Sequence, residues 1–239
     1  MDEGSKKLAY INIVANFLIV AGILFILLAY SQVIYDEVWY KFKSLKKQEY
    51  ILQAGMVKES AKESVFSKFL SSSPVLIKPV NTSFSIVIEK IDVNAPINAD
   101  VSVIDSKKYF ESLKTGVAHA ASSNYPSTEP GNVYLFAHSS INFWQLGKYA
   151  KTFNLLRKLA NGDKIHVFYE GKDYIYEVVN KETMKGFNTY PLKRAVIESI
   201  LTLQTCDPPG TTLNRLVVTA KLVEVRPRSD LGPTLGVLE

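Results

Sequence analysis

The run from Leu8 to Tyr35 carries no charged side chain and is bracketed by Lys7 and Asp36. About twenty apolar residues in a helix cross the roughly 30 Å hydrocarbon core of a bilayer, so this run is long enough to span it with tilt. It is too long for the apolar core of a signal peptide, and no small-residue cleavage site follows it. A buried core helix is the alternative, which the length of the uncharged run disfavours. The sequence therefore predicts a short tail at 1–7 and one transmembrane helix at 8–35.

The flanks of this run bear on its orientation. Aromatic residues follow its apolar centre, where an aromatic belt would meet lipid headgroups: Tyr30, Tyr35, Trp39 and Tyr40. Lysines are fewer before the run (Lys6 and Lys7) than after it (Lys41, Lys43, Lys46 and Lys47). By lysine count alone, the following domain would stay in the cytoplasm. The activity suggested by the rest of the chain places it outside, so we expect a single-pass cell-membrane protein with an extracytoplasmic domain, against a weak charge bias. Membrane lipid is a predicted partner through this helix.

The segment 36–80 is charged, permits helix and ends near a Ser-Ser-Ser-Pro break at 71–74. A solvated juxtamembrane stalk is favoured here over a partner-binding helix. A catalytic domain is predicted at 81–226, and a loose tail at 227–239.

Most of the segment 81–226 is typical of strands. Apolar residues alternate with other side chains over 84–89, and a turn at 170–173 separates two strand-like runs as in a hairpin. A long strand is predicted at 216–225, and Phe153, Leu156 and Leu159 have helical spacing. The predicted fold class is mainly β: a closed or partly closed barrel with one or two short helices, after one transmembrane helix.

Composition excludes several classes of function. The net charge is +5, and no Lys/Arg stripe with interleaved aromatics is present, so nucleic acid is not an expected partner. The single cysteine rules out an intramolecular disulfide framework. The three histidines lack metal-ligand spacing, and scattered acids such as Asp100 and Asp105 lack the spacing of a calcium loop. No metal and no cofactor are predicted, and calcium dependence stays open.

Three reactive side chains stand at the ends of strand-like runs. Cys206 ends the run 201–206, Arg215 opens the run 216–218, and His138 closes the run 133–137. A thiolate can attack a carbonyl carbon, an imidazole can move a proton, and a guanidinium can stabilise an oxyanion. Together they permit acyl transfer through a thioester. As residue types alone, they could equally be an inert buried thiol, a core histidine and a surface ion-pair partner.

Several motifs carry a longer resemblance, and they occur in this order: 85–97 (SIVIEKIDVNAPI), 116–119 (GVAH), 129–139 (EPGNVYLFAHS), 201–206 (LTLQTC) and 214–218 (NRLVV). This arrangement resembles the sortase family of membrane-anchored cysteine transpeptidases, over about residues 82–225. The Thr-Leu-x-Thr-Cys element followed by an arginine is the most specific part. The subclass stays open among classes C, D and E, and no Asp-Pro-aromatic element resembles the lid of pilin-polymerising members.

The resemblance implies a role for each matched residue. Cys206 would attack the Thr-Gly carbonyl of a signal similar to Leu-Pro-x-Thr-Gly, His138 would protonate the leaving amine, and Arg215 would bind the oxyanion. The substrates would be surface proteins or pilins, and the acceptor an amine of the cell wall or a pilin lysine. The residues expected near the substrate are Thr205, Ala137 and His119, although a structural role is equally open for His119.

Two other functions remain open from the sequence. A membrane-anchored cysteine hydrolase would share the same thiol and imidazole. A non-catalytic surface-interaction module could use the same barrel without needing Cys206.

Overall fold

The computed structural model describes residues 3–46, 49–52, 75–102, 105–138, 149, 151–186 and 188–227. Its helices are α1 (Glu3–Leu45), α3 (Ser106–Thr115) and α4 (Tyr190–Lys193), with short 3-10 turns η1 (Glu89–Ile91) and η2 (Leu156–Lys158). Its strands are β1 (Tyr50–Leu52), β2 (Val75–Ile77), β3 (Phe84–Ile88), β4 (Val93–Val101), β5 (Val117–Ala120), β6 (Gly131–Phe136), β7 (Lys164–Tyr169), β8 (Lys172–Lys185), β9 (Ser199–Asp207) and β10 (Asn214–Arg226).

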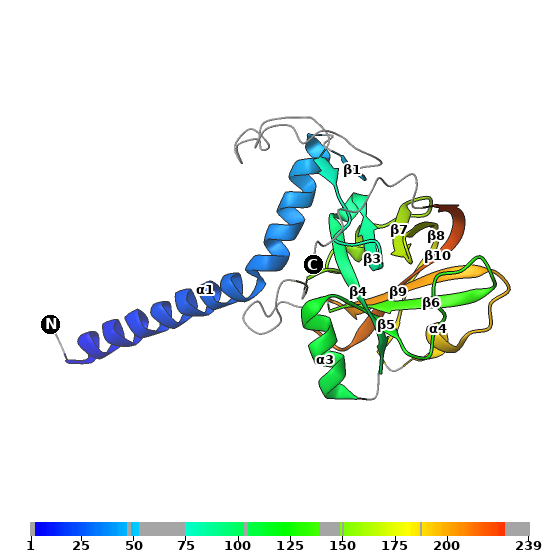
Figure 1. Cartoon of the computed structure of the whole chain (residues 1–239). Helices are drawn as coiled ribbons and strands as arrows, with labels where there is room; N and C mark the ends of the chain where they lie inside the picture. The colour runs from blue at the N-terminus through cyan, green and yellow to red at the C-terminus, as the bar shows by residue number, and fades with distance from the viewer. Residues whose placement is uncertain are drawn as a thin grey trace, which may run out of the picture.

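A closed barrel forms the body of the described chain, in the strand order β10-β8-β7-β3-β4-β5-β6-β9 (Figure 1). Most neighbouring strands are antiparallel, but β4 pairs with β5 and β6 pairs with β9 in parallel. Closure removes the exposed edges that an open sheet would carry. The predicted mainly β fold with a closed barrel is confirmed. The predicted hairpin corresponds to β7 and β8, and the predicted final strand to β10.

The barrel interior is filled by alternate residues of its strands. On the wall made by β6, β9 and β10, the inward residues are apolar and buried: Val133, Leu135, Ala137, Leu201, Leu203, Leu216, Val218 and Ala220. Because successive side chains of a strand point to opposite faces, the residues between them face outward. Part of that outer face carries a second small cluster, which includes Tyr134 and Phe136 under helix α3. This wall therefore has a packed inner face and a chemically different outer face.

The segment around 153–159 differs from the expected helix. It forms a series of turns and the 3-10 turn η2 rather than an α-helix. Phe153, Leu156 and Leu159 are all fully buried in the barrel core. Their spacing correctly indicated that these residues share a buried face. In a segment this short, turns and 3-10 hydrogen bonds bury the three side chains as an α-helix would, and 3-10 turns are common in connecting segments.

Helix α1 is 43 residues long, and residues Lys7–Ser31 form a candidate membrane span with a mean hydropathy of 2.7. None of the span is buried against the rest of the described chain. One apolar N-terminal helix of this kind fits a membrane anchor or a signal sequence. In Figure 1 the helix leaves the barrel, and it bends before its last part runs beside the barrel.

The last part of α1 contacts the barrel through charged and aromatic residues. Asp36 pairs with Lys151 at 3.3 Å, and Glu37 pairs with Lys158 at 2.8 Å and with Arg157. Tyr40 packs against the main core cluster. Part of the segment predicted as a stalk is thus helical and in contact with the barrel. The boundaries 36–80 and 81–226 stay predictions, and 53–74 and most of the tail 227–239 lie outside the described residues.

Candidate active site

Strand pairing brings Cys206 and Arg215 directly opposite one another. In the antiparallel pair of β9 and β10, Cys206 is the register partner of Arg215. Directly opposed residues of an antiparallel pair project to the same face, with Cβ atoms about 4.5–5.5 Å apart. Both flank inward residues, so they lie on the outer face of the wall. Both side chains are half-buried.

His138 reaches the same place from the other side of β9. Strand β6 runs parallel to β9 with Phe136 opposite Gln204, and the Ala137 amide donates to the Gln204 carbonyl at 3.2 Å. Continuing this register by two residues places His138 level with Cys206. Because Ala137 points into the core, His138 faces outward. The three reactive side chains predicted from the sequence therefore share one face of three adjacent strands.

A buried hydrogen bond supports this arrangement from the inner face. The Thr205 hydroxyl donates to the Ala137 carbonyl at 3.0 Å, and both residues are buried. Each of them directly precedes a reactive residue in the chain. The bond therefore ties the backbone that carries Cys206 to the backbone that carries His138.

Helix α3 supplies two aromatic rings that the sequence analysis did not include. The Tyr109 ring meets His138 edge-on at 6.3 Å between centroids and stacks on Phe136 at 5.2 Å. The Phe110 ring stacks on His138 at 5.9 Å. The sequence does contain a signal for this helix. Asp105 caps it by accepting from the Lys107 and Lys108 amides, and the amphipathic spacing places Tyr109 and Leu113 on one side.

Burial of the site affects the protonation of the His138 imidazole and the Cys206 thiol. Burial lowers the pKa of His138 below its usual range. Burial also raises the pKa of the Cys206 thiol, and the positive charge of Arg215 opposes part of that rise. The thiol and the imidazole are therefore both mainly neutral near pH 7. Nε2 of His138 is buried and has no hydrogen-bond partner among the described residues.

Arg215 is oriented by the turn that precedes it. One guanidinium nitrogen donates to the carbonyls of Asn214 at 3.2 Å and Thr212 at 3.4 Å. Gly186, just beyond β8, packs against this turn: a Cβ there would stand 2.6 Å from the Thr212 oxygen. The absence of a side chain at Gly186 thus permits the close approach that fixes the Arg215 turn.

The outer face continues along β9 as a polar track. The Tyr134 hydroxyl donates to the Gln204 side chain, two residues from Cys206. Two residues further, Arg194 donates to both hydroxyls of the opposed pair Thr202 and Thr219, at 2.9 Å each. Tyr134, Thr202 and Thr219 are all buried, so these hydrogen bonds join the strands beneath the protein surface.

The remaining predicted residue, His119, lies in the protein interior. His119 is fully buried, and its Nε2 lies 3.0 Å from both the Asn124 carbonyl and the Ser123 hydroxyl. It packs in an aromatic cluster with Phe84 and Tyr125. Within the described residues no group of three His, Cys, Asp or Glu side chains could hold a metal ion.

Comparisons with known proteins identify the family of this chain. The profile of the sortase domain matches residues 86–223, more than half of the chain. Sortase SrtE1 of Streptomyces coelicolor is 28% identical over 177 residues, which are 67% of this chain and 46% of that protein. The chain thus spans about half the length of this curated relative.

Two solved structures have similar folds. Sortase E1 of Streptomyces coelicolor with a tripeptide in its active site is 27% identical with a TM-score of 0.51, over 64% of this chain and 94% of that one. Sortase C-1 of Actinomyces oris is also 27% identical with a TM-score of 0.51, over 61% of this chain and 76% of that one.

Proposed function

Because this chain belongs to the sortase family, we propose that it is a cysteine transpeptidase with Cys206 as nucleophile, His138 as general acid and base, and Arg215 as oxyanion partner. The observation that carries the proposal is the register: Cys206 opposes Arg215 directly, and the chain after β6 brings His138 level with both. Acyl transfer needs these three functions within reach of one carbonyl group.

The first half-reaction cleaves the substrate. The Cys206 thiolate attacks a peptide carbonyl, and Arg215 donates to the oxyanion that forms. The carbon–nitrogen bond then breaks as His138 gives its proton to the departing amine. The products are a thioester on Cys206 and a free amine.

The second half-reaction forms the new bond. An acceptor amine attacks the thioester while His138 takes the proton that the amine loses. The carbon–sulfur bond breaks, the thiolate leaves, and a new amide is released. No redox step and no additional co-reactant enter this balance.

The resting protonation state limits how often this cycle starts. The reactive form holds a thiolate beside an imidazolium, but the pKa shifts favour the neutral pair. The reactive pair is therefore a minor form whose fraction stays constant between the two pKa values. Arg215 increases this fraction because its charge stabilises the thiolate.

The substrates we propose are surface proteins or pilins with a signal similar to Leu-Pro-x-Thr-Gly, cleaved between Thr and Gly. The acceptor would be an amine of the cell wall or a pilin lysine. Family membership supports this substrate class. We also propose that α1 anchors the enzyme as a single-pass protein with its barrel outside the cytoplasm. Substrate proximity stays a prediction for Thr205, Ala137 and His119, and their burial favours a supporting role inside the barrel.

Product analysis tests this proposal. The full chain in detergent micelles is incubated with a sorting peptide, with and without a glycine-based amine, and the products are identified by mass spectrometry. A transpeptidase forms the new amide when the amine is present, and Cys206→Ala forms none. Cleavage without any amide would support the hydrolase alternative. No cleavage by the native chain, or equal turnover by Cys206→Ala, would contradict the proposal.

A further inference from the structure

The part of α1 that follows the candidate span has two faces of opposite character. We call residues 34–45 the docked segment. Its inner face carries Asp36, Glu37 and Tyr40, which contact the barrel. Lys43 lies on the same face, 3.6 Å from Asp92 and only 8% exposed. This face is held by ion pairs and packing at several points along its length.

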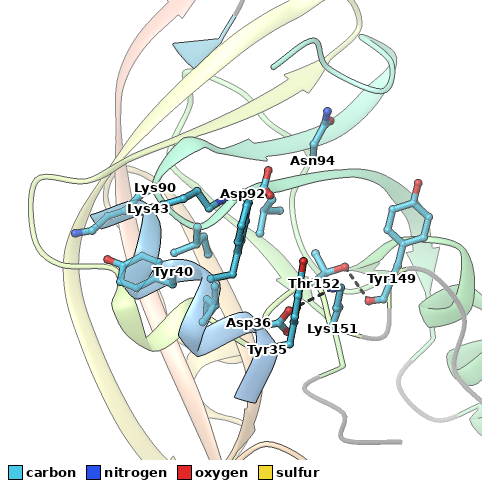
Figure 2. A pocket seen from close by; sticks show the side chains of 14 residues that line it. Tyr35, Asp36, Tyr40, Lys43, Lys90, Asp92, Asn94, Tyr149, Lys151 and Thr152 are labelled. Carbon is cyan, nitrogen blue, oxygen red and sulfur yellow. Dashed lines mark hydrogen bonds and ion pairs between the residues drawn. The ribbon is translucent and has the colours of Figure 1, made fainter. Parts of the chain in front are cut away.

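The contacts of the inner face act together to hold the segment against the barrel. Burial alone would raise the pKa of Glu37, but hydrogen bonds from Lys158 and Arg157 overcome it, so the pKa lies below its usual range. The Tyr50 hydroxyl donates to Asp92 at 2.8 Å, so β1 adds to the same junction. A hollow of about 380 Å³ remains beside these contacts, between α1 and the barrel (Figure 2). Several partly buried ion pairs on one helix face hold it more firmly than a single surface pair would.

The outer face of the docked segment is apolar and uncovered. Ile34, Val38 and Leu45 are 45%, 60% and 84% exposed. With Lys41, they follow the spacing i, i+4, i+7 and i+11, which aligns side chains on one side of a helix. A soluble stalk would carry polar residues at these positions. The stripe begins three residues after Ser31, where the candidate span ends.

We propose that this outer stripe contacts the headgroup layer of the same bilayer that α1 crosses, so that the docked segment lies between lipid and the barrel. Continuity with the span supports lipid as the occupant, because the apolar surface of α1 passes directly into the stripe. Lys41 within the stripe is exposed and suits that layer, because a lysine can keep its charged end among the headgroups while its alkyl stem lies along apolar surface. Amphipathic helices bind this layer with their apolar side inward.

The bend of α1 makes this contact geometrically feasible. Val38 is seven residues beyond Ser31, a rise of about 10 Å along a straight helix. The bend in Figure 1 turns the docked segment away from the axis of the span, so its height above the bilayer increases less than its length. The barrel is then a rigid attachment beside the membrane instead of a domain on a free stalk. The inference rests on the proposal that α1 is a membrane anchor.

Spin labels at single cysteines test this contact in the full chain. In a Cys206→Ala background reconstituted into vesicles with anionic lipid, a nitroxide is attached in turn at Leu24→Cys, Val38→Cys and Ile197→Cys. Leu24 lies in the candidate span, and Ile197 is 91% exposed on the barrel. Collision rates with oxygen and with a water-soluble nickel complex then report lipid and water contact. All three residues are exposed in the protein, so the labels replace no core packing.

We expect the nickel collision rate at Val38 to be several-fold below that at Ile197 and closer to that at Leu24. A Val38 rate equal to the Ile197 rate, with Leu24 shielded, would overturn this inference while leaving the anchor intact. A Leu24 label open to nickel would overturn the anchor itself. Shielding at Val38 with spin–spin broadening would show a second protein copy on the stripe and would also overturn the inference. Peptide transfer by the unlabelled native chain is measured separately. A failure of the transpeptidase proposal can therefore be distinguished from a failure of the membrane-contact inference.

Discussion

The two faces of the wall formed by β6, β9 and β10 differ in chemistry around Cys206, although the same strands supply both. The inner face is a continuous apolar layer that includes Leu135, Leu203 and Val218. The outer face carries His138, Cys206 and Arg215 one residue out of step with that layer. Because side chains alternate along a strand, the inward residues stabilise the barrel while the outward residues form the reactive site.

The inward residues of this wall position the reactive side chains without contacting the substrate themselves. The alternating pattern forces Cys206 outward because Leu203 and Thr205 are held inward. A register slip of one residue would exchange the two faces and remove both core and site. The comparison therefore predicts that substitutions on the two faces produce different kinds of loss.

The largest expected effect comes from the outer face. Cys206→Ala should lower kcat/KM for amide formation by at least about 10³-fold, because no other group can form the thioester. The melting temperature should stay close to that of the native chain, since the residue is only half-buried. Scanning calorimetry and peptide transfer on the same sample check both. A large loss of stability would contradict the proposed division between the faces.

The opposite pattern is expected from the inner face of the same strand. Leu203→Ala removes a fully buried side chain and should destabilise the protein by about 3 kcal/mol through lost burial and the cavity left behind. Denaturant unfolding measures this change. The fraction that remains folded should keep most of its activity, and stability equal to the native chain would break the comparison.

Arg215→Met tests the electrostatic part of the outer face. We expect kcat/KM to fall about 10²-fold, as for the loss of one oxyanion donor. Arg215 lowers the pKa of Cys206, so its removal raises that pKa and moves the alkaline limb of the pH profile to higher pH. The acid limb follows His138, whose pKa is lowered by burial, and should change little.

A matched control for Arg215 exists on the same strand. Arg226 lies at the far end of β10 and pairs with Glu224. Arg226→Met should leave both limbs of the pH profile in place. An alkaline limb that does not move in Arg215→Met, or that moves equally in Arg226→Met, would refute the assigned electrostatic role.

The smallest expected effect concerns the buried hydrogen bond that joins the backbone before Cys206 to the backbone before His138. Thr205→Val keeps the shape of the side chain but removes the donor to the Ala137 carbonyl. The cost should be about 1 kcal/mol of stability. Because the backbone before His138 loses a constraint, kcat should fall several-fold with KM nearly unchanged. A change confined to KM would instead indicate that Thr205 contacts the substrate.

Much of the fold could be predicted from the sequence because its signals are local, whereas the roles of the reactive trio came from the resemblance to sortases and stay a prediction. Cys206, His138 and Arg215 each stand at the end of an apolar run, and period-two alternation defines which face they occupy. Two strand registers, β9 with β10 and β6 with β9, then bring them together. The closed barrel followed from many short strands, although their spatial order did not.

Other features depend on contacts between distant segments and could not be predicted. Glu37 and Arg157 are 120 residues apart, and nothing near either one signals the other. Tyr109 and Phe110 reach His138 only because β4, α3 and β5 fold beside β6. Helical spacing at 153–159 marked buried residues correctly but not the type of turn that buries them.

The central claim is that thiol, imidazole and guanidinium act together on one carbonyl, and intact-mass measurement tests it most directly. The full chain is mixed with a sorting peptide without an acceptor amine, then quenched with acid and weighed. The account predicts a mass increase equal to the acyl portion of the peptide, located on Cys206, released by hydroxylamine and strongly reduced in His138→Ala and Arg215→Met. An adduct on any other residue, or adduct formation that is unaffected by loss of His138 or Arg215, would contradict it.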